Sequence, residues 1–283
     1  MATVALLGTG LLGEAIGHRL LDQGVNLRVW NRSSEKAVSL LGAGAEAITD
    51  LGQAAQGCDT VITVLRDGPV TAEVIAALGD LAGVCCMPMG TMGIAESRAL
   101  ENGVHRQGGC YLEAPVLGSK PEALKGTLLV MAGGEEAVFQ RQLPLLRLLS
   151  EAPKRMGETG SGSASKLALN QLIASLTHGY SLALRLVQAS GLDVERFMEV
   201  LRPSALYAPT VDKKLERMLS HDYANPNFST ALLRKDLQLF LKEAPSLGVE
   251  TQGLQGLADL LARAEHSSLD SCDYSALHEL TGQ

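Results

Sequence analysis

Three glycines near the N-terminus have the spacing of a phosphate-binding turn. Gly8, Gly10 and Gly13 follow an apolar stretch of strand length and open a stretch with helical periodicity. In that context the first glycine permits a tight turn, the second lets a pyrophosphate approach the backbone, and the third lets the helix pack closely on the strand. The N-terminus of the helix then points free amide groups at the anion. The pattern predicts a dinucleotide site, and the alternative is an ordinary glycine-rich turn.

The residues after the second expected strand indicate which dinucleotide would bind. Asn31, Arg32 and Ser33 stand where a site for NAD usually has an acidic residue that binds the ribose hydroxyls. Here no carboxylate would repel a 2′-phosphate, and the Arg32 guanidinium can pair with one. We therefore expect NADP, the alternative being that Arg32 is a solvated surface residue. The expected cofactor contacts are Gly8, Gly10, Leu11, Leu12, Gly13, Asn31, Arg32, Ser33, Leu65, Thr91 and Lys235.

A lysine and an asparagine in the second half of the chain could carry proton chemistry. Lys166 and Asn170 follow a glycine- and serine-rich stretch and are four residues apart, so on a helix they share one face. Carbonyl reduction requires a proton on the developing alkoxide, and an ammonium group can stabilise that oxygen and then protonate it. Burial beside a positively charged nicotinamide is expected to lower the pKa of such a lysine. The alternative for Lys166 is a solvated helix lysine.

Two further segments are candidates for binding a substrate. Residues 113–119 end an expected strand, and a loop of small residues there can turn its backbone N–H groups toward a carboxylate or an oxyanion. Residues 228–236 lie near the start of a later helix and bring Lys235 next to Asp236. The alternative for this Lys-Asp pair is an exposed helix face.

Strand-length and helix-length stretches alternate in the first half of the chain and must position these segments. The expected strands are Thr3–Leu7, Leu27–Trp30, Thr60–Leu65 and Val84–Met87, followed by shorter ones at 111–113, 126–132 and 153–156. The expected helices are 11–23, 33–41, 70–78 and 135–149. Such alternation is typical of a parallel sheet with right-handed crossovers.

Only helix signals follow the glycine- and serine-rich stretch 157–164. The expected helices are 165–189, 194–201, 210–220, 230–243 and 250–264. Gly191 is a candidate cap for the end of the first helix, and Asp193 is a candidate N-cap for the second. We therefore expect an α/β domain over residues 1–160 and an all-helical domain over residues 161–283.

The composition argues against several classes of function. The 283 residues carry a formal net charge of −7 and no basic block, which argues against a nucleic-acid partner. No apolar run reaches the roughly 18 residues of a membrane span, and no targeting segment is evident. Five unpatterned cysteines and six histidines without ligand spacing argue against a disulfide framework and a metal site. Cys85 and Cys86 are interpreted as small core residues. We expect a cytoplasmic protein.

Four motifs of this chain resemble, in their order and spacing, those of the β-hydroxyacid dehydrogenase family, and the resemblance covers nearly the whole chain. The resemblance implies a Rossmann-like NADP-binding domain joined to a helical domain that binds substrate and forms much of the interface of a homodimer or homotetramer. Within the family the chain is most similar to the glyoxylate/succinic semialdehyde reductases. The motifs that carry the resemblance are the turn at 8–13, the loop at 113–120 with Gly126-Thr127-Leu128, the Lys166–Asn170 pair, and the segment from Phe228 to Asp236.

The resemblance also implies an activity and the residues that perform it. The activity is the NADPH-dependent reduction of a small aldehyde acid, such as glyoxylate or succinic semialdehyde, to a hydroxy acid. Lys166 would be the catalytic general acid with Asn170 as its partner, and Lys235 would help to hold the cofactor or the substrate anion. The implied substrate contacts are Thr91, Leu117, Gly118, Ser119, Phe228 and Asp236.

The chain departs from the family pattern at three positions near the expected substrate site. Gly90 and Ile94 replace a serine and a proline, and Leu117 replaces a small polar residue. These changes leave the reaction type intact but bear on which carbonyl compound fits. Thr91 itself has an alternative role as the cap of the following helix.

Two other functions fit the same sequence. An imine reductase would share the cofactor domain and use the apolar Leu117 and Gly90 positions, but such enzymes typically lack the catalytic lysine. A non-catalytic NADP-binding module would bind NADPH without turnover, and such proteins have usually lost the lysine too. The presence of Lys166 therefore favours the reductase.

Overall fold

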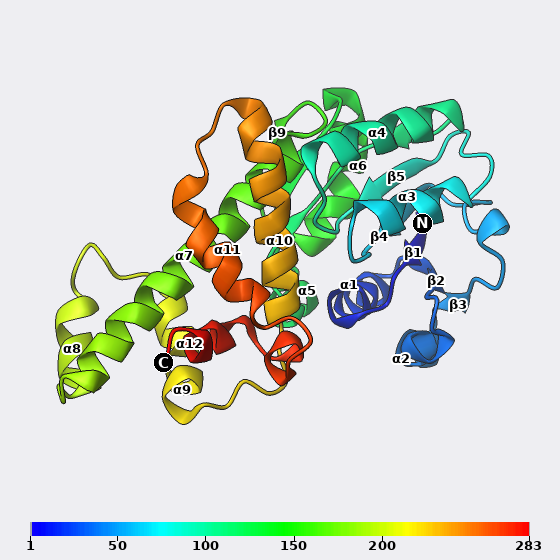
Figure 1. The fold of residues 1–283 in the computed structure, drawn as a ribbon. Coiled ribbons are helices and arrows are strands. Elements are labelled where there is room, and N and C mark those ends of the chain that lie inside the picture. Colours follow the sequence, from blue (N-terminus) through cyan, green and yellow to red (C-terminus); the bar gives the residue numbers. More distant parts are fainter. Residues whose placement is uncertain (1, 283) are drawn as a thin grey trace. The chain divides into compact units, whose positions relative to one another are not determined.

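The computed structural model describes residues 2–282, and the chain divides into two compact units, Met1–Leu167 and Ala168–Gln283 (Figure 1). A six-stranded sheet with only parallel pairings lies at the centre of the first unit. Its order β3-β2-β1-β4-β5-β6 reverses direction between β1 and β4, which is where open α/β sheets bind ligands beyond the carboxyl ends of their strands. The strands are β1 (Thr3–Leu7), β2 (Asn26–Trp30), β3 (Glu46–Ala47), β4 (Thr60–Thr63), β5 (Cys85–Pro88) and β6 (Cys110–Tyr111).

Helices cover both faces of this sheet, so alternate strand residues enter two separate cores. Val4 and Leu6 of β1 pack on one side with α1 and α6, whereas Ala5 and Leu7 pack on the other side with α3 and α4. Burial of both faces is the reason that the strands are almost continuously apolar in sequence. The covering helices are α1 (Leu11–Asp22), α3 (Gly68–Ala76), α4 (Ile94–Arg106) and α6 (Glu136–Leu149).

A smaller sheet in the first unit was not expected from the alternation pattern. It has the order β7-β8-β9, and its β7–β8 pairing is antiparallel. The expected all-parallel arrangement is therefore wrong for this part of the unit, because α5 and a tight return connect β7 directly to β8. The elements are β7 (Val116–Leu117), α5 (Lys120–Lys125), β8 (Leu129–Gly133) and β9 (Lys154–Gly157).

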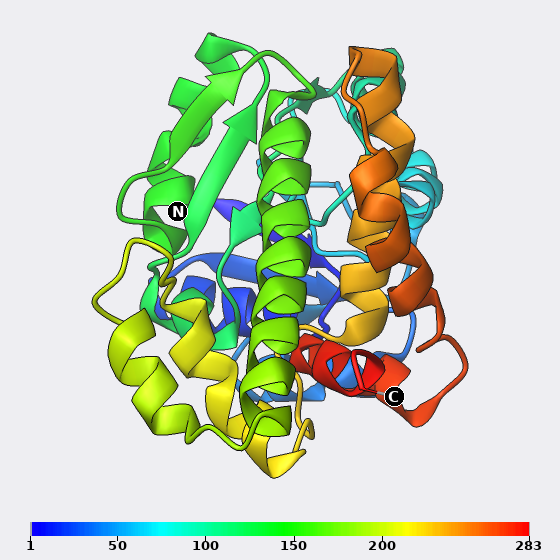
Figure 2. The same cartoon turned by 60° about the vertical axis from the view of Figure 1, so that its left-hand side comes forward.

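The second unit is helical in its described part, as the sequence predicts. One core joins α7, α10 and α11 through Ala174, Leu233 and Leu261, and Figure 2 shows the three helices side by side. A second core joins α7 to α8 and α9. The helices are α7 (Ser161–Ala189), which begins in the first unit, α8 (Val194–Leu201), α9 (Thr210–Ser220), α10 (Thr230–Glu243), α11 (Gln255–Ala262) and α12 (Leu277–Leu280). No described helix is long and apolar enough to cross a membrane.

Several expected bounds are corrected by the structure. The helix expected over 33–41 is a 3-10 turn, Ser34–Ala37, followed by a short α2 (Val38–Gly42). The strand expected over 126–132 starts only at Leu129, because Gly126 (φ +73°) ends α5. The strand expected over 111–113 is β6, and Glu113 makes only an isolated bridge. The helix expected over 250–264 shortens to α11, preceded by a 3-10 turn.

Two caps expected around the end of α7 are present. Gly191 has φ +72°, the left-handed conformation that follows many helix ends. The Asp193 side chain accepts a hydrogen bond from Arg196 N at 2.9 Å and so caps α8.

Candidate functional site

The three glycines of the N-terminal turn differ in the space that surrounds them. Gly8 has φ +101°, and a Cβ there would lie 2.4 Å from the Val64 carbonyl oxygen. A Cβ on Gly13 would lie 1.9 Å from the Gly8 carbonyl oxygen, so only glycine lets α1 pack so closely on the turn. At Gly10 a Cβ would meet no described atom within 4 Å. The backbone of Gly10 is therefore open to a ligand, while Gly8 and Gly13 allow the close packing that the turn requires.

The N-terminus of α1 has the donors that a pyrophosphate needs. Its N-cap is Gly10, so no side chain satisfies the first amides of the helix. The Asn31 side chain accepts a hydrogen bond from Thr9 N (3.0 Å) and donates one to the Ser33 carbonyl (2.9 Å), which joins the turn to the loop after β2. Thr9 Oγ1 is buried without a partner among the described residues. An open backbone, free amides and an orphaned hydroxyl together fit a dinucleotide.

The loop after β2 presents an exposed cation. Arg32 is exposed and makes no hydrogen bond or ion pair with any described residue, so its guanidinium is free to meet a phosphate. Leu11 is 56 % exposed and Leu12 is half-buried beside the turn. Leu65, in the loop after β4, packs against Gly8 and is half-buried. Leu11, Leu12 and Leu65 thus lie at the turn and the N-terminus of α1 within the first unit.

The segment expected to bind substrate forms the β7–α5 connection. Leu117 ends β7, and Gly118 is exposed with φ +129°, a conformation that favours glycine. Ser119 is the N-cap of α5, and both its N–H and its Oγ donate to Glu122 Oε2 at 2.8 Å. The Ser119 hydroxyl thus has a structural role, which the sequence signal Ser-x-x-Glu of a capping box also indicates.

Steric crowding explains why glycine replaces serine at position 90. A Cβ on Gly90 would lie 2.5 Å from the Leu65 carbonyl oxygen, because the loop after β5 runs against the loop after β4. The residue that caps α4 is Gly93, whose N–H donates to Glu96 Oε2 at 2.8 Å. The alternative role of Thr91 as the cap is therefore wrong. Thr91 is half-buried in the loop between Gly90 and this cap.

A buried carboxylate that the sequence did not single out holds the start of α7. Glu113 is 1 % exposed, and its Oε1 accepts hydrogen bonds from Gly160 N and Gly162 N at 2.8 Å and from Ser163 N at 3.3 Å. Its Oε2 accepts from Ser97 Oγ (2.5 Å) and Ser163 Oγ (2.6 Å). A carboxylate at a helix N-terminus also interacts favourably with the helix dipole. These bonds are the reason that α7 begins at Ser161 rather than at the expected residue 165.

Lys166 lies in the second turn of the helix that Glu113 anchors. It is half-buried, and Asn170 follows it one turn later on the same face of α7. Because Glu113 fixes the first turn, the direction in which Lys166 leaves the helix is fixed by the first unit.

A polar cluster in the second unit contains three of the expected residues. Asn170 and Asp236 are each 1 % exposed, and Asn170 Nδ2 donates to Asp236 Oδ2 at 2.5 Å. Lys235 Nζ lies 2.7 Å from Asp236 Oδ1. Asn170 Oδ1 is buried without a partner among the described residues and remains an acceptor. The interpretation of Lys235 and Asp236 as an ion pair on an exposed face is wrong for Asp236, which is buried.

The contacts of Phe228 are with aromatic and apolar residues, not with the polar cluster of Asn170, Lys235 and Asp236. Its ring packs edge-on against Tyr274 with 5.9 Å between centroids, and it borders the core of α10 and α11. The neighbouring Ser229 caps α10 through Leu232 N. Phe228 therefore has a packing role in the second unit.

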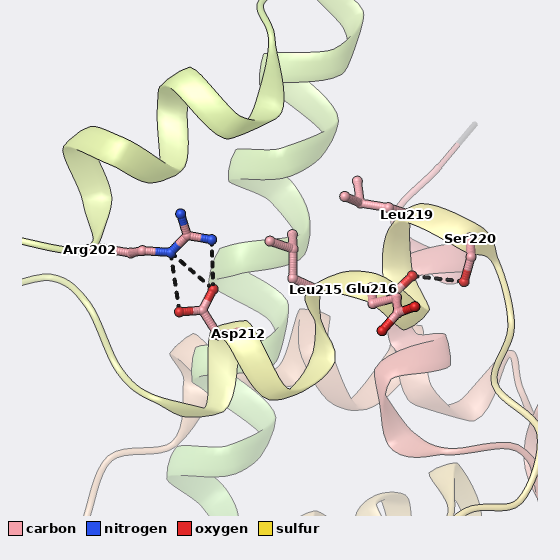
Figure 3. Close-up of a pocket in the computed structure, with 6 residues that line it drawn as sticks. All are labelled: Arg202, Asp212, Leu215, Glu216, Leu219 and Ser220. Carbon is pink, nitrogen blue, oxygen red and sulfur yellow. Dashed lines mark hydrogen bonds and ion pairs between the residues drawn. The ribbon is translucent and has the colours of Figure 1, made fainter.

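A surface pocket in the second unit has none of the expected residues in its lining. It measures about 480 Å³ and is lined by Arg202 and one face of α9 (Figure 3). The Arg202 guanidinium is already paired with Asp212 and Glu195, and the backbone carbonyl of Glu216 accepts a hydrogen bond from Ser220 Oγ. The cation of this pocket is therefore neutralised by acids of the same unit. No cluster of metal-ligating side chains occurs within residues 2–282.

Comparisons with known proteins agree with this geometry. Residues 3–158 match the NAD-binding domain of 6-phosphogluconate dehydrogenase, and residues 160–281 match a model described as NAD-binding of NADP-dependent 3-hydroxyisobutyrate dehydrogenase. Glyoxylate/succinic semialdehyde reductase 2 of Arabidopsis thaliana is 28 % identical over 98 % of this chain and 78 % of its own length. The 2-hydroxy-3-oxopropionate reductase of Escherichia coli is 30 % identical over 97 % of this chain and 95 % of its own length.

A solved structure matches both halves of the fold. The 3-hydroxyisobutyrate dehydrogenase of Mycobacterium tuberculosis superimposes with a TM-score of 0.89 at 25 % identity, over 99 % of this chain and 98 % of that one. The strand order, the glycine turn at the switch point and the helical second unit all agree with these matches. The chain therefore belongs to the β-hydroxyacid dehydrogenase family, whose members are NAD(P)-dependent oxidoreductases acting on CH–OH groups.

Proposed function

We propose that the protein is an NADPH-dependent reductase of small aldehyde acids, such as glyoxylate or succinic semialdehyde, with Lys166 as the general acid. The observation that carries the proposal is a half-buried lysine in the second turn of a helix whose start is held by a buried carboxylate. The names of two relatives support the substrate class, since each denotes a reductase of a short aldehyde acid.

Each residue of the proposed site has a defined task. NADPH supplies a hydride when bound. Lys166 Nζ donates a hydrogen bond to the substrate carbonyl oxygen, stabilises the negative charge that develops there, and then releases a proton to it. Asn170 is held by Asp236 through its amide nitrogen, which leaves Oδ1 as an acceptor for the hydroxyl of the product or an ammonium proton. The Gly118 N–H is the proposed donor for the substrate carboxylate, since the Ser119 N–H already donates to Glu122.

A substrate panel tests the reaction class. NADPH oxidation is followed with glyoxylate, succinic semialdehyde and a cyclic imine, each at several concentrations. We expect saturable turnover of at least one aldehyde acid and none of the imine. Turnover of the imine alone would replace the proposal by an imine reductase, and tight NADPH binding with no turnover would replace it by a non-catalytic module.

Arg32 is expected to set the preference for NADPH. Replacing Arg32 by aspartate removes the guanidinium and adds a carboxylate that repels the 2′-phosphate. The ratio of kcat/KM for NADPH to that for NADH should fall by about tenfold or more, since a charge-assisted hydrogen bond contributes roughly 1.5–3 kcal/mol. Lys36→Gln, which removes another exposed cation of the same loop, is the control and should leave the ratio unchanged. An unchanged ratio in Arg32→Asp would contradict the assignment.

We also propose that the protein forms a homodimer or homotetramer through α7. Leu172, Leu176, Leu182 and Leu186 are 39–72 % exposed on one broad face of this helix. Such a contiguous apolar face typically marks a protein–protein interface. Replacing Leu186 by glutamate should shift the mass measured by light scattering toward the monomer, whereas Val200→Glu on α8, equally exposed, should not. A monomeric wild-type protein would refute this proposal.

A further inference from the structure

Two cysteines face each other across the last pair of strands in the six-stranded sheet. Cys85 of β5 and Cys110 of β6 are register partners, so their side chains point to the same face. Adjacent strands lie about 4.7–4.9 Å apart, which falls inside the roughly 4.4–6.8 Å between Cα atoms that a disulfide spans. Both cysteines are free thiols in this structure. The pair therefore needs little backbone movement to form a bond.

The environments of the two sulfur atoms are unequal. Cys85 is fully buried in the sheet core, whereas Cys110 is half-buried on the edge strand β6. The exposed guanidinium of Arg141 on α6 contacts Cys110 Sγ, whose other contact is the Val84 carbonyl at 3.6 Å. A cation beside a partly exposed thiol is the setting that favours a reactive thiolate.

The protonation of the two thiols follows this asymmetry. The neighbouring Cys85 thiol lowers the pKa of Cys110 to about 7, and Arg141 acts in the same direction, whereas partial burial of Cys110 opposes the shift. The neighbouring Cys110, together with burial, raises the pKa of Cys85 well above its usual range, and Cys86 contributes in that direction as well. At neutral pH one sulfur is thus a nucleophile while its partner keeps a proton to donate.

We propose that Cys110 is a peroxide-reactive cysteine and that Cys85 resolves its oxidised form into a disulfide between β5 and β6. The geometry on which this rests is the register pair, the contact with Arg141 and the position of Cys110 at the sheet edge. The site is independent of the proposed reductase activity. The proposal adds to the interpretation of Cys85 as a core residue. The Cys85 side chain is buried, but it also lies beside the reactive Cys110 in the neighbouring strand.

The oxidant is hydrogen peroxide, and the reaction balances in two steps. The Cys110 thiolate attacks one peroxide oxygen, an S–O bond forms and the O–O bond breaks, and the departing hydroxide takes a solvent proton to become water. Sulfur is oxidised by two electrons and the peroxide is reduced by the same two. The Cys85 sulfur then attacks the Cys110 sulfenic acid, so that an S–S bond forms and the S–O bond breaks. The hydroxide that leaves takes the Cys85 proton as a second water.

Peptide mapping of the full chain tests the proposal. The protein is treated with a small excess of hydrogen peroxide, alkylated with iodoacetamide and digested with trypsin, which places Cys85 in peptide 67–98 and Cys110 in peptide 107–125. We expect a cross-linked pair of these peptides and the loss of two free thiols per chain. Cys86→Ala should retain the cross-link, because Cys86 faces the opposite core. Cys85→Ala should lose it and leave a Cys110 sulfenic acid that dimedone traps.

Cys272 and Arg141 provide matched controls for reactivity. Cys272 is half-buried like Cys110, but its thiol donates to the Ser268 carbonyl at 3.3 Å and contacts no cation. Cys110 should therefore react with iodoacetamide faster than Cys272, and Arg141→Gln should remove this advantage whereas Arg141→Lys should keep it. The proposal is overturned if Cys272 is oxidised before Cys110, if Arg141→Gln reacts like the wild type, or if the cross-link needs Cys86 instead of Cys85.

Discussion

Replacing Lys166 by alanine is expected to lower kcat for the preferred aldehyde acid by about 10²–10⁴-fold, the usual contribution of a positioned general acid. NADPH binding should be unchanged, because the proposed cofactor contacts, which are the glycine turn, Asn31 and Arg32, belong to other elements. Steady-state rates give the first quantity and a fluorescence titration with NADPH gives the second. A loss confined to kcat and kcat/KM shows that the lysine acts in the transition state.

Two variants separate the role of this lysine from a general effect of charge. Lys154 is an exposed lysine of β9 in the same unit, and Lys154→Ala should leave the rate unchanged. Lys166→Arg keeps the positive charge but holds its proton too tightly to release it, so most of the activity should remain lost. Full turnover in Lys166→Ala would remove this residue from the mechanism.

The largest effect on stability is expected at Glu113. Replacing it by alanine leaves the N–H groups of Gly160 and Gly162 and the hydroxyl of Ser163 buried without their acceptor, while Ser97 Oγ keeps its hydrogen bond with Tyr111 Oη. Each buried group that loses its partner costs about 1–3 kcal/mol, so the free energy of unfolding should fall by about 3 kcal/mol or more. Urea denaturation followed by circular dichroism measures this change.

The controls for this prediction preserve shape or remove a single bond. Glu113→Gln keeps one acceptor oxygen and nearly the same volume, so it should lose clearly less stability than the alanine variant. Glu101 accepts one hydrogen bond, from Thr159 Oγ1 at 2.6 Å, and Glu101→Ala should cost only about 1 kcal/mol. If Glu113→Ala unfolds at the same urea concentration as the wild type, the anchoring of α7 by this carboxylate is wrong.

Elements with strong local signals were predictable from the sequence. The bounds of β1, α8, α9 and α10 agree with the expected ones, because β1 is a nearly continuous apolar run and the three helices have a clear period. Helices α8 and α10 also have a recognisable cap in Asp193 or Ser229. Helix α4 follows Thr91, where the sequence allows a helix, but its bounds were not predicted, because its apolar positions are sparse and one of its buried residues is Ser97. The antiparallel β7–β8 pair was missed because β7 has only two residues, too few for a period.

The candidate site was predictable where residue type and local spacing suffice. The turn at Gly8–Gly13 and the pair Lys166–Asn170 are read from spacings of two to five residues. Glu113 was not assigned a role, because its partners on α7 lie 47–50 residues away and nothing local marks a carboxylate as an anchor. The hydrogen bond between Ser119 and Glu122 could have been predicted from the Ser-x-x-Glu pattern of a capping box. Ser119 was instead assigned to a substrate-binding loop, on the resemblance of this segment to a family motif.

Transfer of deuterium from labelled NADPH tests the central claim most directly. The wild-type protein is incubated with NADPH deuterated at the transferred position and with glyoxylate, succinic semialdehyde and a cyclic imine in one mixture, and the products are identified by mass spectrometry. Our account predicts a hydroxy acid that carries one deuterium on the former carbonyl carbon, formed by the wild type and not by Lys166→Ala. A deuterated amine with no deuterated hydroxy acid would contradict it, and so would equal amounts of deuterated hydroxy acid formed by the wild type and by Lys166→Ala.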